Sequence, residues 1–280
     1  MYSTLIDSET VQRNIDRDDW VVVDCRYSLA DTEAGHLAYE KAHLPGAIYA
    51  HLDKDLCGPP VTDFGRHPLP TADVMAARFG RMGIGEGTQV VVYDDANGAI
   101  ASRLWWMLRF MGHDAAAVLD GGWQAWLESG FPTRAGFEAN EAAQFSGAPR
   151  EGWLVTLDDL QGLPILVDSR APERYRGEVE PIDSRAGHIP GAVNFFYQEN
   201  WDENGRYLPP DILRTQFAQL LGDVAAEEAT FHCGSGVTGC ANLLAMAYAG
   251  LGDGRLYVGS WSEWCRDPAR PAITGEKPLR

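Results

Sequence analysis

Short apolar runs that end in a polar residue recur along the chain. Three of them lie at residues 21–24, 91–94 and 165–168, and each ends in aspartate. Helical spacing of apolar positions appears between such runs, for example over residues 102–111. Runs of the first kind predict buried strands, and their alternation with helices is typical of an α/β protein. We therefore expect mostly parallel sheets with helices on both faces.

Three motifs occur twice and in the same order. The paired segments are VVVDCR at 21–26 with ILVDSR at 165–170, AHLPGAI at 42–48 with GHIPGAV at 187–193, and GGWQAW at 121–126 with GSWSEW at 259–264. An ordered set of matches indicates a duplicated domain. The join falls in residues 133–152, which lack strong periodicity, and we place it near Arg150. This predicts one domain over 1–149 and a second over 150–280.

The stretch TFHCGSGVTGC at residues 230–240 joins an apolar run to an apparent helix start. Gly234 and Gly236 flank Ser235 and permit a tight loop whose backbone N–H groups turn inward. The following helix, with apolar residues at 237, 241, 244 and 248, would add the partial positive charge of its N-terminus. We expect Cys233 to lose its proton there and to act as a nucleophile. The alternative is a buried structural cysteine, which the two glycines disfavour.

The two halves differ at the position of this thiol. Aligning residues 91–94 with residues 230–233 places Asp94 opposite Cys233. An aspartate cannot be the same nucleophile, so we expect only the C-terminal half to be catalytically active. The carboxyl ends of parallel strands, where these residues fall, are the usual place for ligands.

Composition narrows the class of protein. The 280 residues are 45% apolar and 22% charged, as in soluble globular proteins, and no apolar run approaches the length of a membrane span. The N-terminus lacks the plan of a secretion signal, so we expect a cytoplasmic protein. The net charge of −17 argues against nucleic-acid binding. Five scattered cysteines without a C-x-x-C pair suit neither a disulfide framework nor a zinc site, so we expect reduced thiols. We also expect no metal and no cofactor.

On these motifs the chain resembles the tandem-domain rhodanese-type sulfurtransferases. The resemblance rests on the paired Asp-x-Arg strand ends, the paired His-x-Pro-Gly turns, the closing Gly-Ser-Trp-Ser-Glu-Trp and the loop Cys-Gly-Ser-Gly-Val-Thr. That loop is similar to the loop of 3-mercaptopyruvate sulfurtransferases, whereas thiosulfate sulfurtransferases usually carry cationic residues in it. Here the two positions after Cys233 are neutral.

The resemblance implies a reaction and a set of loop contacts. Cys233 would take sulfur from 3-mercaptopyruvate, release pyruvate, and pass the sulfur from a persulfide to cyanide or to a thiol such as that of thioredoxin. Thiosulfate is the alternative donor. The substrate would contact Gly234, Gly236, Val237 and Thr238. No homodimer is needed to cover a duplicated chain, so we expect a monomer.

The resemblance also implies roles for residues outside the loop. Arg174 matches the position that binds the donor's anionic group, although by abundance alone a surface arginine is the simpler interpretation. The family's second arginine falls near Ile182 or Asp183 here, which leaves Arg185 as the candidate substitute.

A proton relay is implied as well. His67 and Asp53 match positions that work with the loop serine, so Ser235, His67 and Asp53 would protonate the leaving group. Alternatively, His67 only forms hydrogen bonds within its proline-rich loop. The residues leave both interpretations open.

The same residues disfavour three rival functions. A cysteine phosphatase needs an arginine that closes the loop, and Gly239 stands at that position. A dinucleotide site is suggested by the glycines of residues 83–87, but they precede a predicted strand instead of following one. A non-catalytic binding module is disfavoured by the intact loop at Cys233.

Overall fold

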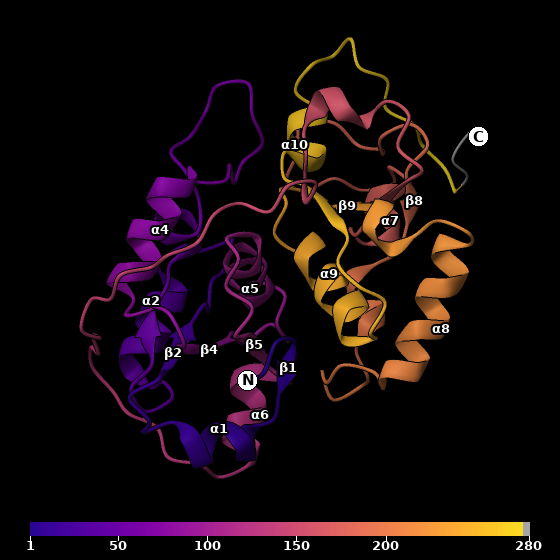
Figure 1. Cartoon of the computed structure of the whole chain (residues 1–280). Coiled ribbons are helices and arrows are strands. Elements are labelled where there is room, and N and C mark those ends of the chain that lie inside the picture. Colours follow the sequence, from indigo (N-terminus) through magenta and orange to yellow (C-terminus); the bar gives the residue numbers. More distant parts are fainter. Residues whose placement is uncertain (277–280) are drawn as a thin grey trace. The chain divides into compact units, whose positions relative to one another are not determined.

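The computed structural model describes residues 1–276, which form two compact units (Figure 1). The main division falls between Arg150 and Glu151. Relative to the contiguous ranges 1–149 and 150–280, two short segments are exchanged: Pro59–Leu69 belongs to the second unit, and Glu203–Tyr207 belongs to the first. No helix within residues 1–276 has both the length and the apolar character needed to cross a lipid bilayer.

The first unit alternates strands and helices. Its strands are β1 (Leu5–Ile6), β2 (Trp20–Asp24), β3 (Ile48–Tyr49), β4 (Gln89–Tyr93) and β5 (Ala116–Leu119). Its helices are α1 (Ser8–Asn14), α2 (Ala34–Lys41), α3 (Leu52–Asp55), α4 (Ala72–Arg81), α5 (Ala101–Phe110) and α6 (Gly122–Glu128).

The second unit repeats this plan, and its described residues also form three 3-10 turns. Its strands are β6 (Leu154–Val155), β7 (Ile165–Asp168), β8 (Val193–Asn194), β9 (Ala229–His232) and β10 (Arg255–Tyr257). Its α-helices are α7 (Pro172–Tyr175), α8 (Pro210–Leu221), α9 (Gly239–Tyr248) and α10 (Ser260–Trp264). The 3-10 turns are η1 (Leu157–Leu160), η2 (Tyr197–Asn200) and η3 (Ala226–Glu228).

The two sheets have the same topology. Their strand orders are β1-β5-β4-β2-β3 and β6-β10-β9-β7-β8, and every pairing between named strands is parallel. The expected pair of parallel α/β sheets is therefore confirmed. Parallel pairing brings the carboxyl ends of β4 and β2, and likewise those of β9 and β7, to one edge of each sheet.

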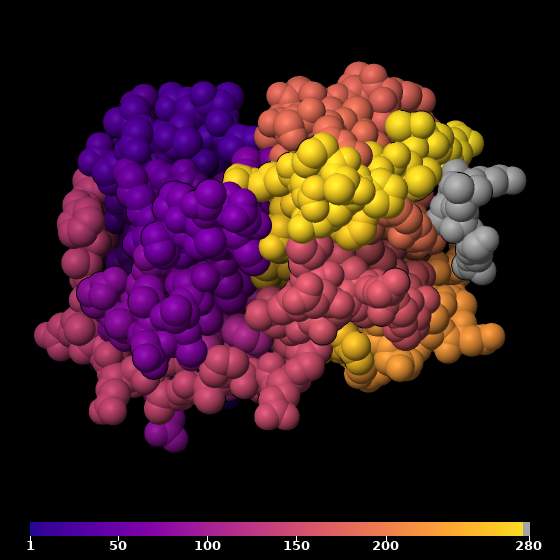
Figure 2. All heavy atoms as spheres, turned by 90° about the horizontal axis from the view of Figure 1, so that it is seen from above, coloured from indigo at the N-terminus to yellow at the C-terminus, as the bar shows by residue number. Residues whose placement is uncertain are grey.

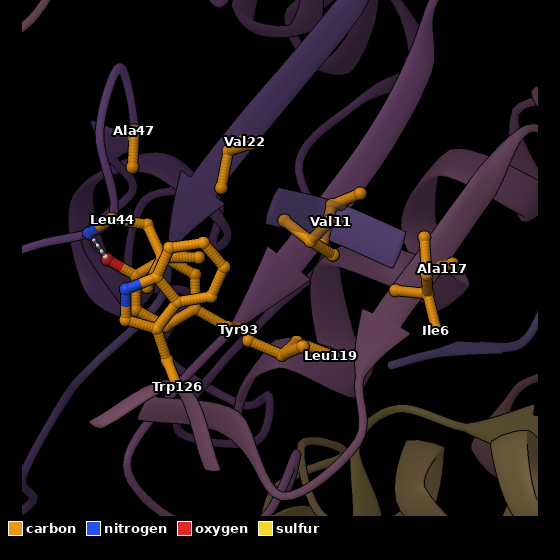
Figure 3. Packing of buried hydrophobic residues seen from close by; sticks show 10 residues of the cluster. Ile6, Val11, Val22, Leu44, Ala47, Tyr93, Ala117, Leu119 and Trp126 are labelled. Atoms are coloured by element: carbon orange, nitrogen blue, oxygen red, sulfur yellow. Dashed lines mark hydrogen bonds between the residues drawn. The ribbon is translucent and has the colours of Figure 1, made fainter. Parts of the chain in front are cut away.

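Burial of the central strands explains why their sequences are almost continuously apolar. All five residues of β4 are buried, and helix α5 packs against β4 and β5. A cluster that includes Val22, Val91 and Ala117 packs with side chains from α1 and α6 (Figure 3). Within it the hydroxyl of Tyr93 accepts a hydrogen bond from the N–H of Leu44 (3.2 Å), which ties the strand to the His-x-Pro-Gly turn.

The connecting segment of residues 133–150 contains no regular helix or strand and lies on the surface of the first unit (pink in Figures 1 and 2). Backbone hydrogen bonds fasten it there at Arg134, Gly136, Ala143 and Arg150. This packing explains why a stretch without periodicity is nevertheless ordered, since its polar backbone groups find partners.

A buried ion pair links the three repeated motifs in each unit. Arg26 pairs with Asp24 (2.6 Å), donates to the carbonyl of Ala42 before the turn, and lies over the ring of Trp123 (4.5 Å). In the second unit Arg170 makes the corresponding contacts with Asp168 (2.6 Å), Gly187 and Trp261 (4.8 Å). The duplicated residues thus form an equivalent set of contacts between Asp, Arg and Trp in each unit, which we call the Asp-Arg-Trp joint.

The histidines of the two turns have matching surroundings. His43 stacks on Tyr39 and His188 on Tyr175, with ring centroids 4.2 Å and 3.8 Å apart. Each Nδ1 lies 2.8 Å from the carbonyl oxygen of the tyrosine on which it stacks. The surroundings are alike in both units, which fits a role in the turn.

Removing one partner of the joint should destabilise the first unit strongly. We predict that Asp24→Ala lowers the free energy of unfolding by about 3–5 kcal/mol, because it leaves the buried Arg26 guanidinium without its carboxylate. Urea unfolding followed by tryptophan fluorescence measures this. Asp19→Ala, which breaks the exposed pair with Arg17, is the control and should leave the transition unchanged. Equal stability of the Asp24→Ala variant and the parent would contradict the assignment.

Candidate active site

The loop of residues 233–238 follows the strand β9 and leads directly into the helix α9 (Figure 1). The start of α10 holds it from the other side: the N–H of Trp261 donates to the carbonyl of Cys233 (3.0 Å), and the N–H of Ser262 donates to that of Gly234 (2.8 Å). The expected strand, loop and helix are therefore present. These two bonds fix the backbone at Cys233 and at Gly234, which restricts where the sulfur can lie.

Cys233 is buried, with 2% of its surface exposed, yet the pKa of its thiol is lowered. Burial by itself raises the pKa. It is outweighed by hydrogen bonds from the Thr238 side chain and from the backbone N–H groups of Ser235, Gly239 and Val237. Donors that stabilise the charged form explain why the pKa of this thiol is lowered in a site with little water.

Two other buried cysteines differ from Cys233 in the direction of the pKa shift. Burial raises the pKa of Cys25 well above that of an ordinary thiol, and it raises the pKa of Cys57 to about 11. Cys233 is therefore set apart from these two buried thiols by its donors and not by its exposure.

Gly236 is required by the shape of the loop. Its φ of +74° is in the left-handed region, and a Cβ there would lie 2.5 Å from the carbonyl oxygen of Val258. Both facts exclude a larger residue without movement of the backbone. The glycine thereby lets the N–H groups of the loop turn toward the sulfur.

Ser260 is a site residue that the sequence analysis missed. It has a φ of +56°, rare for a residue with a side chain, and its hydroxyl accepts a hydrogen bond from the Cys233 N–H (3.2 Å) while donating to Tyr257 (2.9 Å). The corresponding residue of the first unit is Gly122, with a φ of +53°. A serine where the repeat has glycine was the signal available in the sequence.

His67 and Ser235 are brought together by the exchanged segment Pro59–Leu69. Their Nδ1 and Oγ atoms are 2.7 Å apart, and both side chains are buried. Gly65 permits the close approach, because a Cβ there would lie 2.4 Å from the carbonyl oxygen of Gly259. The N–H of Arg66 donates to Ser262 Oγ (3.1 Å). His67 is therefore hydrogen-bonded to the loop serine and is not confined to contacts within its own loop.

Two arginines lie beside Gly234. A Cβ on this glycine would lie 3.0 Å from Nη2 of Arg66 and 3.7 Å from both Nη atoms of Arg174. Arg174 also binds Glu180 (2.7 Å) and Asp183 (3.3 Å), and Arg66 binds Asp183. Arg174 is a residue predicted from the sequence, whereas Arg66 is not, and the only signal for Arg66 was its position next to His67.

The remaining predicted residues lie in other surroundings. Arg185 donates to the carbonyl oxygens of Asp267 and Arg270, both at 3.0 Å. Asp53 lies on α3 of the first unit, where it accepts a hydrogen bond from the Tyr27 hydroxyl (2.9 Å). A substrate contact of Arg185 and a link between Asp53 and His67 stay predictions.

Asp94 occupies the corresponding loop of the first unit. Its carboxylate accepts four hydrogen bonds from backbone N–H groups, at 2.7–2.8 Å, donated by Ala96, Gly98, Ile100 and Ala101. Its carbonyl accepts from the Trp123 N–H (2.8 Å), as that of Cys233 accepts from Trp261. Burial raises the pKa of Asp94, and these N–H bonds oppose the rise. The two loops are thus equivalent, and each surrounds an acidic group.

No group of three or more His, Cys, Asp or Glu side chains within the described part of the chain is arranged to hold a metal ion. The chemistry available at the loop is that of the thiolate, the hydroxyl and imidazole beside it, and two guanidinium groups.

The Thr238 hydroxyl should be measurable in the reactivity of the thiol. Thr238→Val keeps the shape and removes the donor, so we predict that Cys233 titrates at higher pH and reacts roughly tenfold more slowly with iodoacetamide near neutrality. Alkylation rates across a pH series, read by peptide mass spectrometry, measure this. Thr215→Val, on the exposed face of α8, is the control. Superimposable pH profiles for the Thr238→Val variant and the parent would refute the cause assigned to the lowered pKa.

Known proteins that are similar in sequence to this chain include sulfurtransferases. A relative from Pseudomonas aeruginosa, a probable 3-mercaptopyruvate sulfurtransferase, is 42% identical over 97% of this chain and 98% of its own length. A putative thiosulfate sulfurtransferase from Mycobacterium tuberculosis is 37% identical over 91% of this chain and 90% of its own. Relatives of similar sequence identity are thus named for either of the two sulfur donors, mercaptopyruvate and thiosulfate.

Among solved structures, the 3-mercaptopyruvate sulfurtransferase from Leishmania major is similar with a TM-score of 0.84 and 30% identity, over 94% of this chain and 74% of that one. The model of the rhodanese-like domain matches residues 7–129 and again residues 153–267. The two matches coincide with the two repeats, and the chain belongs to the rhodanese-like family.

Proposed function

We propose that this protein is a sulfurtransferase that carries sulfur from 3-mercaptopyruvate to a thiol or to cyanide through a persulfide on Cys233. The observation that carries the proposal is the lowered pKa of a buried thiol surrounded by N–H and O–H donors. A lowered pKa increases the fraction of the nucleophilic thiolate, and the same donors stabilise a persulfide anion. Relatives named for this reaction, similar over almost the whole chain, support it.

The first half-reaction needs no external oxidant. The Cys233 thiolate attacks the donor's sulfur, an S–S bond forms, and the C–S bond of mercaptopyruvate breaks. The electron pair of that bond goes to the enolate of pyruvate, whose carbon then takes up a proton. In the second half-reaction a thiolate or cyanide attacks the outer sulfur and restores the Cys233 thiolate.

Ser235 and His67 are placed to supply the proton. Their 2.7 Å contact makes the hydroxyl and the imidazole a single donor, since either can replace the proton that the other gives up. A histidine suits this work because its ordinary pKa is near neutrality. Asp53 would complete the relay by orienting His67.

Arg174 is proposed to hold the donor's carboxylate, with Gly234, Gly236, Val237 and Thr238 lining the path to the sulfur. The closeness of the Arg174 guanidinium to Gly234 supports this, because a Cβ on Gly234 would lie 3.7 Å from both Nη atoms and Gly234 is the residue next to Cys233. Arg185 would take a secondary part through its remaining donors.

Thiosulfate is the second candidate donor, and one observation favours it. The loop itself carries no cation, but Arg66 and Arg174 reach Gly234 from outside the loop. Two guanidinium groups next to the thiol would suit a dianion. The neutral loop still favours mercaptopyruvate, because the nearest positions to the sulfur stay uncharged.

The remaining parts of the proposal concern the whole chain. The first unit is catalytically inactive, because Asp94 fills the place of the thiol and engages the loop N–H groups. The protein acts as a cytoplasmic monomer, and thioredoxin serves as the thiol acceptor.

The persulfide is directly observable. After mercaptopyruvate is added without an acceptor, we predict that the intact mass of the protein rises by one sulfur atom and returns when cyanide is added. Cys233→Ser should show no gain, whereas Cys57→Ser, which changes a buried thiol in the other unit, should gain sulfur like the parent. Sulfur uptake by Cys233→Ser would place the nucleophile elsewhere.

The choice of donor and the role of His67 are tested together. We expect kcat/KM for mercaptopyruvate to exceed that for thiosulfate. His67→Gln should lower kcat for mercaptopyruvate by about 10²–10⁴-fold, and it should lower thiosulfate turnover much less, because sulfite leaves as an anion without a proton. His36→Gln, at a half-exposed position, is the control. A preference for thiosulfate in the parent would overturn the choice of donor, and equal losses with both donors would remove the proton-transfer role.

A further inference from the structure

A buried carboxylate sits between the two arginines that approach the thiol loop. Asp183 binds Arg66 through Oδ1 and Arg174 through Oδ2 (3.3 Å), and only 5% of its side chain is exposed. All three residues belong to the second unit, Arg66 through the exchanged segment Pro59–Leu69. The carboxylate is thus held in a cationic site within reach of the residue that follows Cys233.

The arginines keep unused donors. The Nε of Arg66 is buried and has no hydrogen-bond partner among the described residues. The hydrogen bonds of Arg174 to Glu180 and Asp183 use Nε and Nη2, while its Nη1 would lie 3.7 Å from a Cβ on Gly234. An anion that binds beside Gly234 would therefore share two guanidinium groups with Asp183.

Sharing the two arginines with Asp183 changes the binding energy of a dianion more than that of a monoanion. Asp183 repels a dianion twice as strongly as a monoanion at the same distance, because the Coulomb energy is proportional to the product of the charges. The attraction of the arginines grows in the same proportion, but Asp183 and Glu180 already offset it, with side chains 5% and 4% exposed. The balance of fixed charge at this place thus sets which anion is preferred.

We propose that Asp183 is a specificity-determining residue that makes the site select monoanionic over dianionic sulfur donors. This inference rests on the proposed sulfur transfer, in which mercaptopyruvate carries one carboxylate and thiosulfate two charges. Asp183 touches neither sulfur nor proton and acts through Arg66 and Arg174. The selectivity of the neutral loop is thereby reinforced from outside it.

Two neutral variants test the proposal, Asp183→Asn and Asp183→Ser, so that a fold defect in one does not decide the outcome. Asp183→Glu retains the charge, and Glu178→Gln, an exposed carboxylate on Arg176, is the matched control. We expect the neutral variants to raise kcat/KM for thiosulfate relative to mercaptopyruvate by roughly fivefold or more. The two controls should keep the ratio of the parent. An unchanged ratio, or the same change in Asp183→Glu, would overturn the proposal.

A binding measurement separates this inference from the reaction on which it rests. Inorganic sulfate and pyruvate, as a dianion and a monoanion, are used to protect Cys233 from iodoacetamide, which requires no turnover. Neutral variants should be protected by lower sulfate concentrations than the parent, with little change for pyruvate. If neither donor loads Cys233 in the parent, the proposed function fails while this result still tests Asp183. Equal shifts for both anions, or no shift, would refute the role of Asp183.

Discussion

A sulfur anion has to be kept where little water reaches it, and that constraint organises the second unit. Burial alone would hold Cys233 protonated, so the loop must supply donors at the sulfur. The demand explains features that are otherwise unrelated: the left-handed Gly236, the helix that starts at Gly239, and Ser260 at a positive φ. Each of these positions an N–H or O–H group near Cys233 or fixes the backbone that does so.

The first unit meets the same constraint with a different ion. Asp94 accepts four N–H bonds in a loop that leads into α5, as the loop at Cys233 leads into α9. An aspartate there satisfies the inward N–H groups permanently and leaves no nucleophile. The Asp-Arg-Trp joint is retained in both units because it fixes the frame on which either loop is built. Both units thus keep a loop of inward-facing N–H groups, while the thiol occurs only in the loop of the second unit.

The repeat, the strands and the thiol loop could be predicted because their signals are local. Apolar runs such as residues 91–94, helical spacing over residues 102–111, and two glycines around Ser235 each act within a few residues of chain. Arg66 could not be found in this way. Its contacts with Asp183 and Gly234 join positions more than a hundred residues apart, and they depend on an exchanged segment that crosses between units. The two backbone carbonyls to which Arg185 donates, those of Asp267 and Arg270, also lie far from it in the sequence and could not be predicted either.

The strongly negative chain still has to bind an anion, and the charges near the loop show how it can. Acidic and basic groups alternate from Asp168 through Arg170, Glu180, Arg174 and Asp183 to Arg66, three of each sign. These six side chains together carry no net charge. They therefore cannot attract anions over a distance against the net charge of −17 of the whole protein. Attraction must come at short range, from guanidinium donors not committed to carboxylates and from loop N–H groups. Hydrogen-bond geometry then orients the bound anion, and the local balance of fixed charge sets the preference between a monoanion and a dianion, while the field of the whole protein opposes every anion.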